Sequence, residues 1–315
     1  MILAITPNLA WDVTYEVDRL TPGTSHRVRR VYGHAGGKGV NVARVAHALG
    51  HPVHVLSMTG GASGQSAADD IDAAGLPATL LPIGGTTRQS ITVVPEQPGS
   101  DDGEPSVFNE PGPTVTNAEW TNLVHSVVAQ ARGTDTGVVT VSGSLPGGVG
   151  REQVAALLSA GEAPCYVDTS GPALRWAATD GAALVKANRS ELLEATGTND
   201  IESGVRVLHD LGAAQVVVTD GAAGMYAFDT RPDAAGDPRA WRARVPHHVP
   251  GNPTGAGDAA LAALAMRRDE PWEHRLRYAV AVSAAAVAEP VAGRVSSDRA
   301  RSMHEQVLIE PIETS

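Results

Sequence analysis

Short apolar runs alternate with alanine-rich stretches along most of this 315-residue chain. The apolar runs have the length of strands buried on both faces, at Val53–Met58, Gly137–Ser142, Cys165–Asp168, Ala183–Lys186 and Gln215–Thr219. The stretches between and after them are typical of helices, at Asn41–Leu49, Arg151–Ser159, Ser190–Ala195, Gly204–Leu211, Ala259–Met266 and Trp272–Ala288. This alternation predicts an α/β fold, doubly wound, with a mainly parallel sheet and helices on both of its faces.

Two regions depart from the alternation and have the period-two pattern of half-exposed strands. One lies at about residues 8–35 and the other at about residues 86–112, where the polar stretch Glu96–Ser106 predicts a hairpin loop. Together they predict a small antiparallel β-flap, added to the main sheet as a lid. We therefore expect residues 1–315 to form one domain that carries this lid.

The composition excludes several classes of protein. The net charge of −11 argues against a nucleic-acid-binding surface, which must be basic. A membrane span needs a run of about 18 apolar residues, and none is present, so we expect no membrane partner. Met1–Ile5 is expected to be a buried strand rather than part of a signal peptide. The single cysteine, Cys165, is expected to be a buried strand residue in a reducing, cytoplasmic compartment.

Lysine is scarce in this chain. Of its 24 basic residues, only Lys38 and Lys186 are lysines, and the rest are arginines. A lysine ammonium is a compact point charge, whereas the arginine guanidinium is a broad plane. The two lysines therefore indicate positions that require an ammonium group, and chance is the alternative explanation.

The stretch Gly251–Asp258 has the pattern of a turn that opens a helix. Gly255 and Gly257, on either side of Ala256, let the backbone approach a ligand with its N–H groups, and the helix adds its positive end. Such a turn would bind a phosphate group. Asp258 lies beside it and is placed to accept a proton from an attacking hydroxyl. The alternative is that Asp258 only caps the helix.

A second glycine-rich stretch, Gly36–Asn41, surrounds Lys38 and opens another helix. Gly37 permits a close backbone approach, Lys38 supplies a positive charge, and Asn41 can form hydrogen bonds with sugar hydroxyls. The spacing differs from that of a Walker loop, Gly-x-x-x-x-Gly-Lys-Ser/Thr. The alternative is a glycine-rich loop with a solvated lysine, which the scarcity of lysine disfavours.

Lys186, Asn188 and Glu191 stand where a buried strand is expected to end and a helix to begin. Asn188 and Glu191 are three residues apart, so they share a face of the helix start. They can hold a hydrated Mg²⁺, an ion that needs few protein ligands. The same pair also fits an N-cap with its glutamate partner, and both interpretations remain open.

Weaker signals come from three further stretches. Gly221 and Gly224 follow a buried strand and are placed to pass beneath a nucleotide. Ser144 follows another strand, at the edge where α/β sheets bind ligands. Arg88 and Asn109 lie on the second flap segment. Each of them alone is weak evidence for a binding site, and they support one only together with the other motifs.

In order along the chain, these motifs resemble the PfkB/ribokinase family of carbohydrate kinases. They are Asp12, Gly36-Gly-Lys-Gly-x-Asn41, Asn109-Glu-Pro-Gly-Pro113, Ser142-Gly-Ser-Leu-Pro146, Asp168-Thr-Ser-Gly171, Lys186-x-Asn-x-x-Glu191 and Gly255-Ala-Gly-Asp258, and they span nearly the whole chain. Gly-Ala-Gly-Asp marks the family. The motifs at Gly36, Asn109 and Ser142 together resemble its 1-phosphofructokinase and tagatose-6-phosphate kinase branch, whose substrates already carry one phosphate.

The resemblance implies a ribokinase-like fold, ATP and Mg²⁺ as cosubstrate and cofactor, and a homodimer formed through the lid. It also implies roles for individual residues. Asp258 would be the catalytic base, and Gly255, Ala256 and Gly257 would form the anion hole. The nucleotide would lie against Lys186, Asn188, Thr219, Gly221 and Gly224, with Mg²⁺ held through water by Asn188 and Glu191. The sugar phosphate would be held by Asp12, Arg27, Gly37, Lys38, Asn41, Arg88, Asn109 and Ser144.

Three positions depart from the family pattern. Ala187 replaces the usual proline between a lysine and an asparagine. His34 stands where the branch has aspartate, and Trp11 places a large ring beside the expected sugar contact Asp12. The changes at His34 and Trp11 lie on the sugar side, so they affect the identity of the substrate rather than the class of reaction.

The leading prediction is the ATP-dependent phosphorylation of fructose 1-phosphate to fructose 1,6-bisphosphate. Tagatose 6-phosphate, fructose 6-phosphate or an unphosphorylated sugar are alternative acceptors for the same chemistry. A non-catalytic regulator that binds sugar or nucleotide is an alternative of another class. A dinucleotide-dependent oxidoreductase is excluded, because Thr6–Ala10 stands where Gly-x-Gly-x-x-Gly would follow the first strand.

Overall fold

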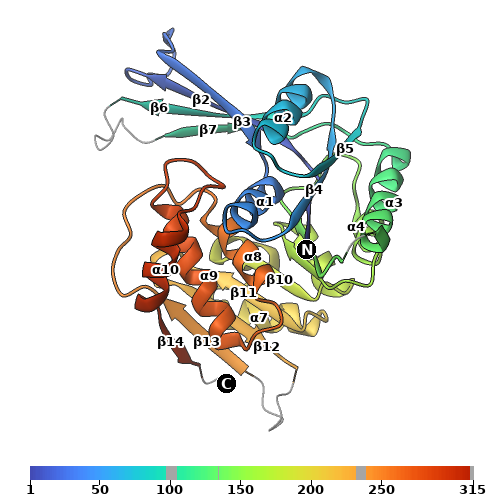
Figure 1. The fold of residues 1–315 in the computed structure, drawn as a ribbon, viewed down its shortest axis with the longest axis vertical. Helices are drawn as coiled ribbons and strands as arrows, with labels where there is room; N and C mark the ends of the chain where they lie inside the picture. Colours follow the sequence, from blue (N-terminus) through green and yellow to red (C-terminus); the bar gives the residue numbers. More distant parts are fainter. Residues whose placement is uncertain (97–104, 134, 232–238, 313–315) are drawn as a thin grey trace.

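The structure, a computed structural model, describes residues 1–96, 105–133, 135–231 and 239–312. Its larger sheet contains β1 (Ile2–Thr6), β4 (Val53–Thr59), β5 (Ala78–Pro82), β8 (Val138–Ser142), β9 (Cys165–Asp168), β10 (Leu184–Asn188), β11 (Gln215–Thr219), β12 (Met225–Asp229), β13 (Arg239–Arg244) and β14 (Leu308–Pro311). The strand order is β14-β13-β12-β11-β10-β9-β8-β1-β4-β5 (Figure 1). The strands from β11 to β5 are parallel, and β12, β13 and β14 are antiparallel additions.

Helices cover both faces of this sheet. One face carries α1 (Lys38–Ala48), α2 (Gly61–Ala73), α8 (Ala256–Met266), α9 (Trp272–Val287) and α10 (Ser297–Gln306). The other carries α3 (Asn117–Gly133), α4 (Arg151–Leu158), α5 (Pro172–Thr179), α6 (Arg189–Thr196) and α7 (Ile201–Asp210). Neighbouring residues of β1 enter opposite clusters, with Ile2 in the first and Leu3 in the second, because successive side chains of a strand point to opposite faces. The predicted doubly wound α/β fold is confirmed.

A second, four-stranded sheet projects from the main body, and we call it the small sheet (Figure 1). Its order is β3 (Arg30–Gly36), β2 (Ala10–Val17), β6 (Arg88–Pro95) and β7 (Ser106–Asn109). The two outer pairs are antiparallel, but the central pair of β2 and β6 is parallel. The prediction of a wholly antiparallel flap is therefore wrong. β2 and β6 follow β1 and β5, two parallel strands, so both leave the same edge of the large sheet in the same direction.

Several elements lie where the sequence predicted none. α2, α3 and α5 are helical, and α10 and β14 follow Ser296. α10 is polar and buries only Ala300, so its sequence lacks the apolar stripe by which a helix is recognised. The loop predicted at Glu96–Ser106 lies mostly outside the described residues.

Two smaller expectations also have an outcome. Cys165 is buried in β9, and burial raises the pKa of its thiol to about 12. Within the described ranges, no helix combines the length and the apolar character that crossing a membrane requires.

Candidate active site

Charged and polar side chains gather at one edge of the large sheet, where its parallel strands end. Asp168 is the last residue of β9, Lys186 and Asn188 lie at the end of β10, and Thr219 ends β11. The helices α1 and α8 begin at this edge and pack against each other on one face of the sheet (Figure 1). The fold thus brings together motifs that are far apart in the sequence.

Asp168 lies at the centre of this group and is fully buried. Its Oδ1 accepts a hydrogen bond from Lys38 Nζ at 2.9 Å, and its Oδ2 accepts one from Lys186 Nζ at 2.5 Å. Asp168 and Lys186 are paired across β9 and β10, so strand register itself brings them together. Burial alone would raise the pKa of the Asp168 carboxyl, but the ammonium groups of Lys186 and Lys38 outweigh burial and lower it to about 2. Both lysines of the chain therefore contact one carboxylate.

Asp258 lies in the first turn of α8 and is 6% exposed. Its Oδ2 accepts a hydrogen bond from Asn41 Nδ2 of α1 at 2.8 Å. Burial raises the pKa of the Asp258 carboxyl to about 7, and the negative charge of Asp168 acts in the same direction. The N-cap of α8 is Gly255, so capping is not the role of the Asp258 side chain. A carboxyl group with such a pKa can accept a proton near neutral pH.

The backbone at the start of α8 has the geometry of an anion site. Gly255 has a φ of 83°, a left-handed conformation that glycine adopts without strain. A Cβ added to Gly257 would lie 3.1 Å from Lys186 Nζ, so the ammonium group sits against this turn. The N–H groups of a first helical turn have no partner within the helix. Together with Lys186, they favour a negative group at this end of α8.

Asn188 and Glu191 cap α6 and also reach the charged centre. Asn188 Oδ1 accepts a hydrogen bond from Glu191 N at 2.8 Å, and Asn188 N donates one to Glu191 Oε2 at 2.9 Å. Glu191 Oε1 accepts a third, from Lys38 Nζ at 3.2 Å. Burial alone would lower the pKa of the Lys38 ammonium, but Asp168 and Glu191 hold it above its ordinary value. The cap therefore positions Glu191 for its contact with Lys38, and the two interpretations of this pair are compatible.

Thr219 and Gly221 lie beside this centre, because β10 and β11 pair Asn188 with Thr219. Gly221 is exposed, and a Cβ added there would have no atom within 4 Å. Gly224 is different. A Cβ on Gly224 would lie 2.2 Å from the carbonyl oxygen of Ala243 in β13, and the φ of Gly224 is 104°, so strand packing and backbone conformation both require glycine here.

Asn8 joins several residues that were predicted to bind the acceptor sugar. Its Nδ2 donates hydrogen bonds to Ser144 Oγ at 3.1 Å and to the carbonyl oxygen of Pro111 at 3.2 Å. The backbone carbonyl oxygen of Asn8 accepts a hydrogen bond from Arg88 Nε at 3.3 Å. The loop at Asn109–Pro113 is thereby held close to Ser144 and Arg88.

Asp12 lies on the small sheet next to the first glycine loop. A Cβ added to Gly36 would lie 2.0 Å from Asp12 Oδ2, so the carboxylate rests over this glycine. Gly37, with a φ of 99°, is the N-cap of α1. Burial raises the pKa of the Asp12 carboxyl, while electrostatic interactions with His34 and Arg88 act to lower it.

Two residues predicted to bind the acceptor are exposed on the small sheet. Asn109 is exposed on β7 and accepts a hydrogen bond from Ser90 Oγ at 2.8 Å. Arg27 is exposed on the connection between β2 and β3, at the outer end of the small sheet (Figure 1). Among the described residues, no hydrogen bond or ion pair joins Arg27 to the other residues predicted to bind the acceptor.

No role was predicted for Asp168 or Asn8 from the sequence. A signal for Asp168 was present, because a buried ammonium such as that of Lys186 requires a counter-charge. The sequence does not show which strand lies beside which, so the partner of Lys186 stayed unidentified. Asn8 follows the first strand, at the ligand-binding edge, and this was its only signal.

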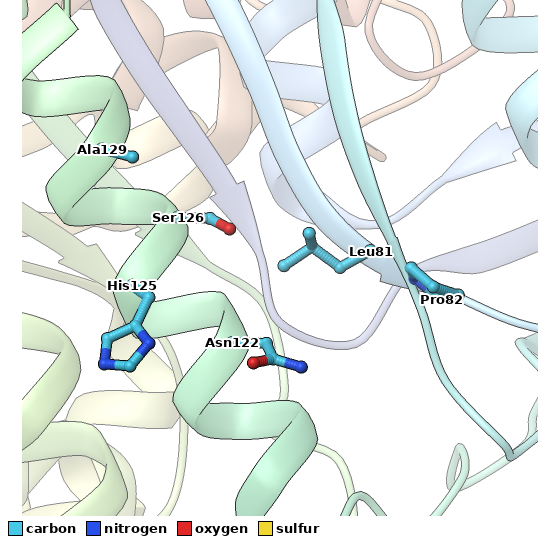
Figure 2. Close-up of a pocket in the computed structure, with 6 residues that line it drawn as sticks. All are labelled: Leu81, Pro82, Asn122, His125, Ser126 and Ala129. Atoms are coloured by element: carbon cyan, nitrogen blue, oxygen red, sulfur yellow. The ribbon is translucent and has the colours of Figure 1, made fainter.

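A shallow pocket of about 380 Å³ lies away from this centre, between α3 and β5 (Figure 2). Figure 2 shows Leu81 of β5 pointing toward the side chains of α3, with Pro82 next to it on the strand. The rest of its lining is Asn122, His125, Ser126 and Ala129. His125 is its only titratable residue, so the pocket offers no counterpart to the charged centre.

Residues 7–299 match a family model described as pfkB family carbohydrate kinase. The 1-phosphofructokinase of Haloferax volcanii is 36% identical over 230 residues, which cover 71% of this chain and 72% of that protein. The 1-phosphofructokinase of Escherichia coli K12 is 30% identical over 320 residues, 98% of each chain. Phosphofructokinase-2 from Escherichia coli, solved in complex with potassium, superimposes with a TM-score of 0.86 at 26% identity, covering 96% of this chain and 98% of that one. The chain therefore belongs to the pfkB family of carbohydrate kinases, and it is an ATP-dependent sugar kinase with a ribokinase-like fold.

Proposed function

We propose that this kinase transfers the γ-phosphoryl group of ATP to the free primary hydroxyl of a ketohexose phosphate. The leading acceptor is fructose 1-phosphate, which gives fructose 1,6-bisphosphate. The observation that carries the proposal is the buried carboxyl group of Asp258, whose pKa is raised to about 7, at the start of α8 beside Lys186. Similarity to two proteins named 1-phosphofructokinase supports the choice of acceptor.

Asp258 is the base of the proposed reaction. The acceptor hydroxyl gives its proton to the Asp258 carboxylate as its oxygen forms a bond to the γ-phosphorus, and the bond from that phosphorus to the bridging oxygen of ADP breaks. Asn41 holds the carboxylate in place through its hydrogen bond of 2.8 Å. With a pKa of about 7, the group is ionised often enough to act at neutral pH and is basic enough to take the proton.

The start of α8 and Lys186 stabilise the charge on the transferring group. The N–H groups of Gly255 and Gly257 offer donors to the phosphoryl oxygens, and Lys186 adds a positive charge next to them. The N–H group of Ala256, also predicted to belong to the anion hole, already donates a hydrogen bond to the carbonyl oxygen of Pro253 at 3.2 Å. The nucleotide extends from here over the ends of β10 and β11, past Asn188, Thr219 and the open surface at Gly221.

Asn188 and Glu191 fit a hydrated Mg²⁺. The Oδ1 of Asn188 and both carboxylate oxygens of Glu191 each accept one hydrogen bond, so each keeps a second lone pair for a bound water. Within the described ranges, no group of three or more His, Cys, Asp or Glu residues could hold a metal directly, so the ion would keep most of its waters. When bound, it would neutralise charge on the nucleotide phosphates.

The acceptor lies between the glycine loop of α1 and the small sheet, which acts as a lid. Asp12, Gly37, Asn41 and Asn109 bind the sugar. Its existing phosphate is held by Arg88, Ser144 and Lys38, and by Arg27 when the lid has closed or has paired with a second copy.

Exposed apolar side chains on the small sheet support a homodimer through this lid, and they are Val31, Tyr32, Val107 and Phe108. The buried, unpaired thiol of Cys165 suits a cytoplasmic enzyme.

An ADP-release assay with Mg-ATP tests the proposal across fructose 1-phosphate, tagatose 6-phosphate, fructose 6-phosphate, free fructose and free ribose. Preference for a phosphorylated ketohexose is the expected result. Turnover of only a free sugar would keep Asp258 as the base and overturn the phosphate contacts of Arg88 and Ser144. If protein shown to be folded released no ADP with any sugar of the panel, the proposed reaction on these acceptors would be overturned.

A further inference from the structure

Four polar side chains form a continuous row across the small sheet. Strand register pairs Asn109 of β7 with Ser90 of β6, Ser90 with Asp12 of β2, and Asp12 with His34 of β3. Paired residues of neighbouring strands point to the same face of a sheet. Asp12 and Asn109 were predicted acceptor contacts. His34 was predicted only to affect the identity of the substrate, with no contact assigned to it, and Ser90 had no assigned role. We call these four residues the polar row.

The polar row lies next to the main body. Asp12 rests over Gly36, which directly precedes the N-cap of α1. One step farther out on the same face, the row of Val107, Thr92, Thr14 and Tyr32 includes two side chains that are about half exposed. The polar row is therefore the part of the small sheet that a sugar bound near Asp12 would meet.

His34 has hydrogen-bonding capacity that the protein does not use. Its Nδ1 is buried and has no partner. Its Nε2 is not among the buried unpaired atoms and forms no hydrogen bond with the described parts of the chain, so solvent reaches it. Buried N–H groups without an acceptor are rare in proteins. We therefore assign the proton of the neutral ring to Nε2, and the imidazolium form has a proton there as well.

We propose that His34 is a specificity-determining residue, which donates a hydrogen bond from Nε2 to an acceptor-sugar hydroxyl that is also bound by Asp12. A hydroxyl group donates one hydrogen bond and accepts others. A carboxylate beside an N–H donor matches both capacities. An aspartate at position 34, as in the branch that the sequence resembles, would offer acceptors only. The proposal rests on the proposed function in one respect, namely that the acceptor is a sugar bound beside Asp12, and it is independent of the phosphate.

The pair His34→Gln and His34→Met tests this role. Glutamine retains an N–H donor near the position of Nε2, whereas methionine has a similar length and no donor. With the wild-type acceptor, we expect His34→Met to raise the acceptor KM about tenfold and His34→Gln to raise it less than about threefold. The KM for ATP should stay unchanged in both. Thermal unfolding of the two variants controls for loss of the fold.

Deoxy acceptors separate a direct contact from a structural effect. The acceptor KM of His34→Met is compared with that of wild type on 3-deoxy and on 4-deoxy fructose 1-phosphate. For the analogue that lacks the contacted hydroxyl, we expect the two KM values to agree to within about threefold, because neither protein can form the hydrogen bond. An equal penalty on the parent sugar and on every analogue would overturn the proposal, as would failure of His34→Gln to restore the KM.

The wild-type panel is measured first, so that errors in the two proposals can be told apart. If a free sugar is the acceptor, the proposed phosphate contacts fail, and the same comparison with deoxy forms of that sugar still decides the role of His34. A wild-type protein that neither turns over nor, by calorimetry, binds any sugar of the panel would overturn both proposals.

Discussion

The two sheets of this protein differ in whether their polar side chains are buried and paired within the protein. At the edge of the large sheet, Asp168, Lys186 and Asp258 are almost completely buried, and each has a charged or hydrogen-bonded partner within the chain. On the small sheet, neither ring nitrogen of His34 has a hydrogen-bond partner among the residues that the structure describes, and Tyr32 is 49% exposed. The groups proposed for phosphoryl transfer are therefore positioned by the fold itself, before any ligand binds. The proposed acceptor surface, in contrast, keeps hydrogen-bonding capacity at His34 that a bound ligand would use.

The largest effect is expected for Asp168→Asn, which tests the buried polar groups at the edge of the large sheet. The substitution leaves the ammonium groups of Lys38 and Lys186 without their shared counter-charge, and breaking a buried ion pair costs about 3–5 kcal/mol. We expect the free energy of unfolding, measured by urea denaturation, to fall by this amount. A loss below about 1 kcal/mol, the range of an exposed pair, would show that the centre is not preorganised by charge.

The next effect is catalytic. Asp258→Asn removes the proposed base but keeps the shape of the side chain, so kcat should fall at least ~10²-fold while ATP binding stays nearly intact. Steady-state kinetics and calorimetric titration with ATP measure the two quantities. Full turnover by the variant would refute the assignment of the base.

The pH dependence follows from the same carboxyl group. The proposed base must be ionised, and its pKa is about 7 in the folded protein. Below that pH, kcat/KM for the acceptor should fall about tenfold per pH unit, and above it the rate should level off. A profile that stays flat from pH 5 to pH 8, over the range where the protein is folded, would contradict the buried setting of Asp258.

Stability should respond in the opposite direction to activity. The pKa of Asp258 is higher in the folded state than its ordinary value of 3.8, so wild type loses stability as pH rises through this interval. Asp258→Asn does not ionise. We expect the variant to be more stable than wild type at pH 8 by about 2 kcal/mol, with a smaller difference at pH 5. Equal stability at both pH values would indicate that ionised Asp258 bears no burial penalty.

The smallest effect on folding is expected at the outer end of the small sheet. Tyr32 and Val107 are about half exposed, so replacing both by serine should change the free energy of unfolding by less than about 1 kcal/mol. If the small sheet forms a dimer interface, the same double variant should weaken dimerisation, as measured by sedimentation. Thr24→Ala and Ser25→Ala, on the exposed connection between β2 and β3, serve as controls. Unchanged association in the Tyr32 and Val107 variant would place any dimer interface elsewhere.

Much of the large sheet and its edge could be predicted from the sequence. Buried parallel strands are short apolar runs, and ligand-binding residues follow their carboxyl ends, so Lys186, Asn188 and Asp258 stood out. Strand order was not predictable, since no local pattern shows that β9 lies beside β10. The partnership of Asp168 with both lysines depends on that order. The parallel pairing of β2 with β6, and with it the polar row, depends on register in the same way.

Some glycines also had more than one explanation. Gly221 and Gly224 look alike in the sequence, but only Gly221 lies at an open surface. Gly224 is explained by its closeness to Ala243 on β13, a contact between residues about twenty positions apart. A motif therefore indicates where glycine is needed, and packing in three dimensions decides why.

The placement of both lysines around Asp168 has a practical consequence for spectroscopy. Apart from the chain's amino terminus, every primary amine of this sequence lies in the charged centre. The Lys38 side chain is 35% exposed and the Lys186 side chain 3%, so a reagent in solution reaches Lys38 more readily than Lys186. Isotope labelling of lysine would give a spectrum with two side-chain ammonium signals, and both would report on the surroundings of Asp168, where the phosphate groups are proposed to bind, without any engineered probe.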